Sequence, residues 1–220
     1  IARMREYGFN SFILANYDVE PGELGYFDAL LAACDQAGML LSFTLPHAKD
    51  FDWKLHEPAM SNAFYRLTEW LIRRVQNHPA VVLYAMSHNS AGYAGDQNPL
   101  KMDGVYDPDR FGRAASDPDE LWRRRSRAQA MLGERIARRI DPDRPVYHHH
   151  SGHLGDFHTV NIYLNWAPIQ ERSDWLAHWS TAGRKPMFFV EWGLPHIASW
   201  SSYRGPKFIW RNPVLQCAWV

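Results

Sequence analysis

Glu191 is the residue of this chain whose position points most directly to chemistry. It ends the apolar run Met187–Val190 and is followed at once by Trp192. A carboxylate at the end of a buried strand is costly unless the protein uses its charge, and catalytic residues of parallel α/β barrels lie at such strand ends. We therefore predict a catalytic role for Glu191. The structural alternative is an ion pair with Arg144 or Arg184.

A group of histidines forms a second candidate site. Its members are His148, His149, His150, His153 and His158. Side chains alternate along a strand, which would place His148 and His150 on one face. With Asp156 or Glu191 nearby, these imidazoles could bind a metal ion and support metal-assisted hydrolysis. We favour the other interpretation, in which they are polar residues that contact a substrate.

Composition narrows the classes of partner. The 24 basic and 24 acidic residues give a net charge of zero, which points to neither nucleic acid nor an anionic membrane. The 31 aromatic residues (10 Trp, 10 Tyr, 11 Phe) suit a groove that stacks flat, hydroxyl-rich ligands. We expect no cofactor, no signal peptide and no transmembrane helix in this chain. The compartment stays open, and a secreted or periplasmic parent protein is compatible with the sequence.

Strand and helix patterns alternate along the chain. We predict strands at residues 9–15, 39–45, 81–86, 145–149, 159–164 and 186–190, and helices at 21–37, 58–76, 119–140 and 168–181. This order implies βαβ units and a parallel sheet, and the almost wholly apolar strands suit a sheet covered on both faces.

Either a doubly wound sheet or a barrel fits this order, and two observations favour the barrel. No glycine-rich phosphate loop follows the first strand. Polar or ionisable residues follow nearly every strand, as in a barrel that builds one site from many loops; they are Asn16, His47, His88, Asn89, His148–His150, Asn165 and Glu191.

Six local motifs in order resemble a known family. They are residues 7–10 (YGFN), 31–39 (LAACDQAGM), 74–82 (RVQNHPAVV), 141–146 (DPDRPV), 156–163 (DFHTVNIY) and 185–193 (KPMFFVEWG). Together they resemble the catalytic barrel of glycoside hydrolase clan A, of the β-galactosidase, β-glucuronidase and β-mannosidase type. The resemblance implies a (β/α)8 TIM barrel of which the second to seventh strands are recognisable. We expect residues 1–220 to form one such domain, as a fragment of a longer chain. Flanking domains or a homo-oligomer could complete it.

The resemblance implies roles for particular residues. Glu191 would be the nucleophile of a retaining mechanism, and Tyr163 would hydrogen-bond its carboxylate. Asn89 would hold the sugar 2-hydroxyl. Ser90 stands where the family carries its acid/base glutamate, and a serine hydroxyl is too weak an acid to replace it.

The missing acid leaves three alternatives. Another residue could donate the proton, with Asp96 or Asp103 ahead of His88. The barrel could have lost hydrolysis and only bind a glycan. The leaving group could need little protonation. We expect His47 to contact the sugar, and Trp166 and Trp192 either to stack on it or to pack in the wall of the pocket.

Three functions therefore remain in order of preference. The first is a glycosidase acting on β-linked oligosaccharides or glycosides with an atypical or relocated acid/base. The second is a non-catalytic carbohydrate-binding barrel. The third is a metal-dependent hydrolase that uses the cluster His148–His158.

Overall fold

The computed structural model describes residues 1–14, 24–48, 62–88, 118–152, 154–162 and 169–192. Helices and strands alternate through them: α1 (Ala2–Glu6), β1 (Ser11–Leu14), α2 (Leu24–Ala37), β2 (Leu40–Thr44), α3 (Ala63–Val75), β3 (Val81–His88), α4 (Pro118–Ile140), β4 (Val146–His149), β5 (His158–Ile162), α5 (Ile169–Ala182) and β6 (Met187–Trp192). Each strand and each of the four long helices overlaps a range predicted from the sequence.

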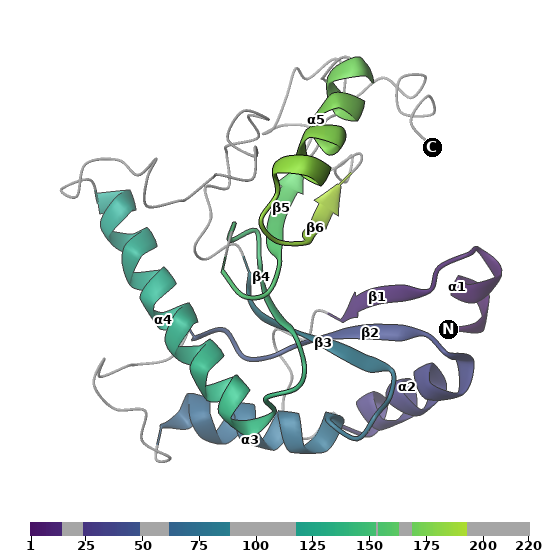
Figure 1. The fold of residues 1–220 in the computed structure, drawn as a ribbon. Helices are drawn as coiled ribbons and strands as arrows, with labels where there is room; N and C mark the ends of the chain where they lie inside the picture. The colour runs from purple at the N-terminus through teal and green to yellow at the C-terminus, as the bar shows by residue number, and fades with distance from the viewer. Residues whose placement is uncertain (15–23, 49–61, 89–117, 153, 163–168, 193–220) are drawn as a thin grey trace.

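The strands form two parallel sheets. One has four strands in the order β1-β2-β3-β4, and the other pairs β5 with β6 (Figure 1). Every pair within each sheet is parallel. Sequential parallel strands joined by helices are what successive units of a barrel wall produce. Within the described ranges, the sheet does not close.

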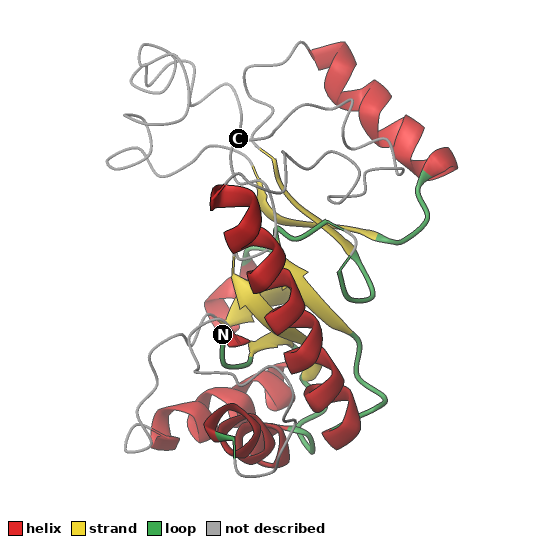
Figure 2. Cartoon of the chain, turned by 90° about the vertical axis from the view of Figure 1, so that its left-hand side faces the viewer, coloured by secondary structure: helices red, strands yellow, loops and turns green. Residues whose placement is uncertain are grey.

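Helices α2, α3 and α4 cover one face of the four-stranded sheet, which we call the outer face; Figure 2 shows α4 lying across the sheet. The main hydrophobic core lies between them. It includes Phe27 and Leu31 of α2, Phe64 and Ile72 of α3, Leu132 and Ile136 of α4, and Leu41, Phe43, Tyr84, Met86 and Val146 of the sheet. Burial of these apolar side chains is the main force that holds the helices on the sheet.

The opposite, inner face carries a smaller core around Tyr147. Ala85 and Val190 are buried beside this ring. The Ser42 hydroxyl donates to the Tyr147 hydroxyl oxygen over 2.9 Å. Since Ser42 lies on β2 and Tyr147 on β4, the bond reaches across β3 on the inner face and links two strands that are not neighbours in the sheet.

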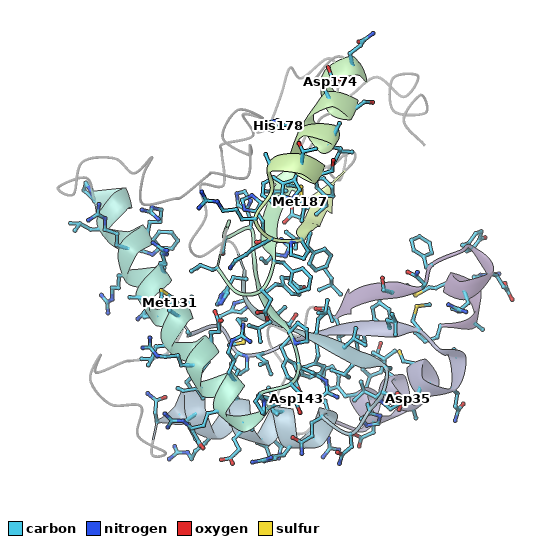
Figure 3. The ribbon with its side chains drawn as sticks, viewed as in Figure 1. Asp35, Met131, Asp143, Asp174, His178 and Met187 are labelled. Atoms are coloured by element: carbon cyan, nitrogen blue, oxygen red, sulfur yellow. The ribbon has the colours of Figure 1, made fainter. Side chains whose placement is uncertain are left out.

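Polar contacts explain two of the sequence motifs. Asp35, at the end of α2 (Figure 3), accepts from the Ala80 backbone N–H at 2.9 Å and contacts His78 Nδ1 at 2.6 Å. It therefore ties the end of one helix to the turn before β3. In the second motif, Asp141 accepts from the hydroxyl of buried Tyr84 at 2.9 Å and forms an ion pair with Arg144.

The two sheets are joined by the chain between β4 and β5. Gly152 and Thr159 exchange two backbone hydrogen bonds, of 3.2 and 3.0 Å. The Thr159 hydroxyl also donates to the His148 carbonyl and accepts from the Ser151 N–H. These bonds hold the start of β5 against the end of β4. Among the described helices, none has the length and apolar character needed to cross a membrane.

Candidate active site at the ends of β4 and β6

Strand β4 directs its side chains alternately to the two faces of the sheet. Val146 packs in the core under the helices, whereas Tyr147 packs in the inner-face cluster. His148 contacts Glu134 of α4 and thus points to the outer face. Alternation places His149 on the inner face, above Tyr147.

His149 and Glu191 meet at this inner face. His149 Nε2 lies 2.9 Å from Glu191 Oε1, and the two side chains are 8% and 19% exposed. Both residues stand at the carboxyl ends of their strands, β4 and β6. The pair is therefore shielded from water but still accessible, and it lies at the strand ends where an α/β barrel binds its substrate.

A β-bulge in β6 precedes Glu191. The ladder pairs Val160 of β5 with Phe189, and then Asn161 with Glu191. Val190 therefore has no counterpart on β5. A single extra residue of this kind changes which side chains point to which face beyond it.

The bulge explains how Glu191 reaches His149. Phe188 packs edge-on against Tyr147, with ring centroids 4.8 Å apart, so Phe188 lies on the inner face. Glu191 comes three positions later and would point to the other face of a regular strand. The extra residue turns its carboxylate back to the inner face, where it bonds to His149.

Strand β3 has a similar irregularity at the same level. Its ladder pairs Ala85 with Tyr147 and His88 with His149, so three steps along β3 match two along β4. The backbone of His88 therefore lies beside that of His149. Bulges are common at barrel rims and next to active sites, because they redirect side chains there.

The outer face of β4 is fixed by an ionic network with α4. His148 Nε2 lies 3.0 Å from Glu134 Oε2, and Arg138 Nε donates to Glu134 Oε1 at 2.8 Å. Arg138 also contacts Asp156 at 2.9 Å. The same Asp156 oxygen accepts from the Val146 backbone N–H at 2.7 Å. The network thus connects both ends of β4 to the last turns of α4.

This network lowers the pKa of Glu134. Burial alone would raise that pKa, but hydrogen bonds and positive charge from His148 and Arg138 outweigh it and bring the value to about 2. The pKa of Asp141 is also lowered, because hydrogen bonds from Tyr84 and Arg144 and the Arg144 charge outweigh burial. Both carboxylates are therefore ionised in the folded protein near neutral pH.

The structure corrects the expectation for His148. Its side chain is 0% exposed and bonds to Glu134, so it is held against α4 and does not contact a substrate. His150 is buried too, but it follows the end of β4 in a left-handed conformation with φ 52°. Strand alternation therefore does not apply to it, and its substrate contact stays a prediction.

The ion pair considered between Arg144 and Glu191 is not formed. Arg144 binds Asp141 and the Val81 carbonyl instead, at the amino-terminal side of the sheet. The carboxylate of Glu191 contacts His149. His47 is half-buried just past the end of β2, and its sugar contact stays a prediction.

The remaining predicted site residues lie outside the described part of the chain. They are Asn89, Ser90, Asp96, Asp103, Tyr163 and Trp166, together with the side chains of His88 and Trp192. Among the residues that the structure describes, no group of three or more His, Cys, Asp or Glu side chains could hold a metal ion. His148 and His149 instead point to opposite faces, each towards a different carboxylate.

His149 is the residue of the candidate site that sequence reasoning did not single out. Strand alternation separates His149 from His148, but it does not show which of the two faces lies towards the helices. Only the packing of Val146 and Tyr147 on opposite faces settles that choice.

Comparison with known proteins now identifies the family. Residues 1–220 match the family model described as "Glycosyl hydrolases family 2, TIM barrel domain". The chain belongs to this family. The partial TIM-barrel class inferred from the sequence is thereby confirmed, and β1 to β6 are strands of a family 2 barrel. No curated protein sequence matches the chain significantly.

Several solved β-glucuronidases have a similar fold. The β-glucuronidase 2 of Bacteroides uniformis, covalently bound to cyclophellitol-6-carboxylate aziridine, has a TM-score of 0.56 at 20% identity, over 97% of this chain and 25% of that one. The β-glucuronidase of Bifidobacterium dentium, complexed with coumarin-3-O-glucuronide, has a TM-score of 0.55 at 16% identity, and the match covers 90% of this chain and 30% of that one. The β-glucuronidase of Faecalibacterium prausnitzii has a TM-score of 0.51 at 16% identity, and the match covers 90% of this chain and 31% of that one.

These likenesses establish the fold alone, because the identities are low. The chain spans under a third of the length of each of these three structures.

Proposed function

We propose that this chain forms part of the catalytic domain of a β-glycosidase that uses Glu191 as the nucleophile of a retaining mechanism. The observation that carries the proposal is the placement of Glu191, a partly buried carboxylate at the carboxyl end of β6 with His149 beside it at 2.9 Å. Membership of glycoside hydrolase family 2 supports this assignment. The substrate class is a β-linked glycoside or oligosaccharide.

In this mechanism an oxygen of Glu191 attacks the anomeric carbon while the bond to the leaving oxygen breaks. An acid protonates that oxygen, and water then hydrolyses the glycosyl ester. The acid must lie about 5 to 5.5 Å from the nucleophile, across the scissile bond. His149 is in direct contact with Glu191, so it does not meet this requirement. Asp96, Asp103 and His88 remain the candidates for the donor.

The decisive experiment compares Glu191→Ala with Glu69→Ala on a panel of aryl β-glycosides with activated leaving groups. These substrates need little protonation, so they report on the nucleophile even if the donor is weak. We expect Glu191→Ala to lose turnover and azide to restore it. Glu69 is a surface residue of α3 paired loosely with Arg73 at 3.9 Å, and its variant should behave as wild type. Unchanged turnover in Glu191→Ala would contradict the proposal.

A covalent probe provides an independent test. Opening of a cyclophellitol-type aziridine by Glu191 would form an ester at the ring carbon and break its C–N bond, with the proton going to nitrogen. Peptide mapping should then find the label on the peptide that contains Glu191. Glycan affinity with neither turnover nor labelling would favour the non-catalytic carbohydrate-binding barrel, an alternative that Ser90 motivates.

A further inference from the structure

We propose that His149 is a positioning residue for the nucleophile: its Nε2–H binds one oxygen of Glu191 and thereby orients the carboxylate whose other oxygen attacks the anomeric carbon. This inference rests on the proposed function of Glu191. It assigns to His149 a contact that the family resemblance placed on Tyr163.

The direction of the hydrogen bond follows from chemistry. An ionised carboxylate can only accept hydrogen bonds, whereas either imidazole nitrogen can carry a proton. While Glu191 is ionised, the 2.9 Å contact therefore requires the proton on His149 Nε2. A charge-assisted bond of this kind fixes the orientation of the carboxylate and favours its ionised form.

The backbone around His149 is well fixed. Its carbonyl accepts from the Ser151 hydroxyl at 3.2 Å, and the preceding carbonyl, that of His148, accepts from the Thr159 hydroxyl. On the two faces of β4, Tyr147 is bonded to Ser42 and His148 to Glu134. The imidazole of His149 therefore projects from a strand that is held on both faces, which suits a group that must aim a nucleophile.

The same contact has a competing interpretation. In a carboxylate–imidazole dyad the carboxylate orients the histidine, and the histidine moves a proton in the reaction. A positioning residue needs only an N–H at the Nε2 position, whereas a proton carrier needs a titratable ring. A neutral donor of the right length separates the two roles.

His149→Gln supplies that donor, because the glutamine amide nitrogen can occupy roughly the place of Nε2. His149→Leu removes the donor at similar size, and His149→Asn keeps an amide that is one bond too short. With activated aryl β-glycosides, we expect His149→Leu and His149→Asn to lose about 10- to 100-fold in kcat, the effect of one hydrogen bond to a charged group. His149→Gln should stay within about threefold of wild type in kcat, and KM should change little throughout.

Each outcome decides the question. A kcat of His149→Gln as low as that of His149→Leu would overturn the proposal and assign proton transfer to His149. A wild-type kcat in His149→Leu would overturn it as well. If His149→Leu fails to fold, judged by its melting temperature, the ratio of kcat between His149→Gln and His149→Asn gives the same answer. Glu191→Ala runs beside these variants: if it retains turnover, the proposed function fails, whereas an inactive Glu191→Ala with an active His149→Leu removes only the role of His149.

Discussion

Replacing Glu134 with glutamine tests whether the ionic network on the outer face of β4 stabilises the fold. The substitution keeps the shape of the side chain and one acceptor oxygen, but it replaces the other oxygen with an NH2 group and removes the charge that His148 and Arg138 surround. The loss of the hydrogen-bond acceptor is the same at every pH, so the pH-dependent part of the effect reports the charge. Its contribution can be worked out from the pKa of Glu134.

That pKa falls from an ordinary 4.5 to about 2 in the folded protein. A lowered folded-state pKa stabilises the protein above the unfolded-state value, and the stabilisation is lost as the pH falls through the folded-state value. The shift corresponds to about 3 kcal/mol in the free energy of unfolding at pH 5 and above, and to about 2 kcal/mol at pH 3.5. The Glu134 side chain is only 18% exposed, so screening by solvent is limited.

Urea unfolding of the wild type and of Glu134→Gln at pH 7, 5 and 3.5 measures the contribution of the Glu134 charge to the free energy of unfolding. The difference in unfolding free energy between the two proteins should shrink by about 1 kcal/mol between pH 5 and 3.5. Glu69→Gln is the matched control, since its exposed pair should contribute little at any pH. A wild-type-to-variant difference that does not change with pH would refute the electrostatic account of the network.

Three further substitutions test local features of the fold. Gly155 has φ 75°, and a Cβ there would lie 2.6 Å from the Val146 carbonyl oxygen, so Gly155→Ala should lower unfolding free energy by at least about 1 kcal/mol. Gly25→Ala is the control, because Gly25 lies in a helix and a new Cβ there would have nothing within 4 Å. Thermal melts of both variants should show Gly25→Ala to be neutral or stabilising and Gly155→Ala to be destabilised. Asp35→Ala leaves the buried N–H of Ala80 without its acceptor, so it should lower the free energy of unfolding measured in urea by about 1 to 3 kcal/mol. A decrease of less than about 0.5 kcal/mol would contradict this role of Asp35.

The arrangement of helices and strands could be predicted from the sequence because its cause is local. Apolar residues recur at helical spacing in α3, for example, and β2 and the first four residues of β6 are rich in apolar side chains. The polar motifs at the helix-to-strand turns were recognisable as well, although their partners were not. The structure shows that Asp35 of one motif binds His78 and Ala80 of another, a contact between residues more than 40 positions apart.

The candidate site was only half predictable. Glu191 was conspicuous, since a single charge at the end of an apolar run has few structural explanations. Its partner was not, because choosing among three consecutive histidines requires knowing which face of β4 lies towards the helices. Burial of Val146 under the helices, and of Tyr147 on the other face, settles that choice.

The sequence by itself determined the order of the elements, the family resemblance and the carboxylate at the end of β6, because these depend on residue types and on neighbours along the chain. Only the tertiary structure decided that Glu191 faces His149. An extra residue in β6 reverses the side-chain alternation just before Glu191, and strand periodicity in the sequence does not show where a ladder slips by one residue. The meeting of two residues 42 positions apart thus depends on pairing between strands, and pairing is a property of the folded chain.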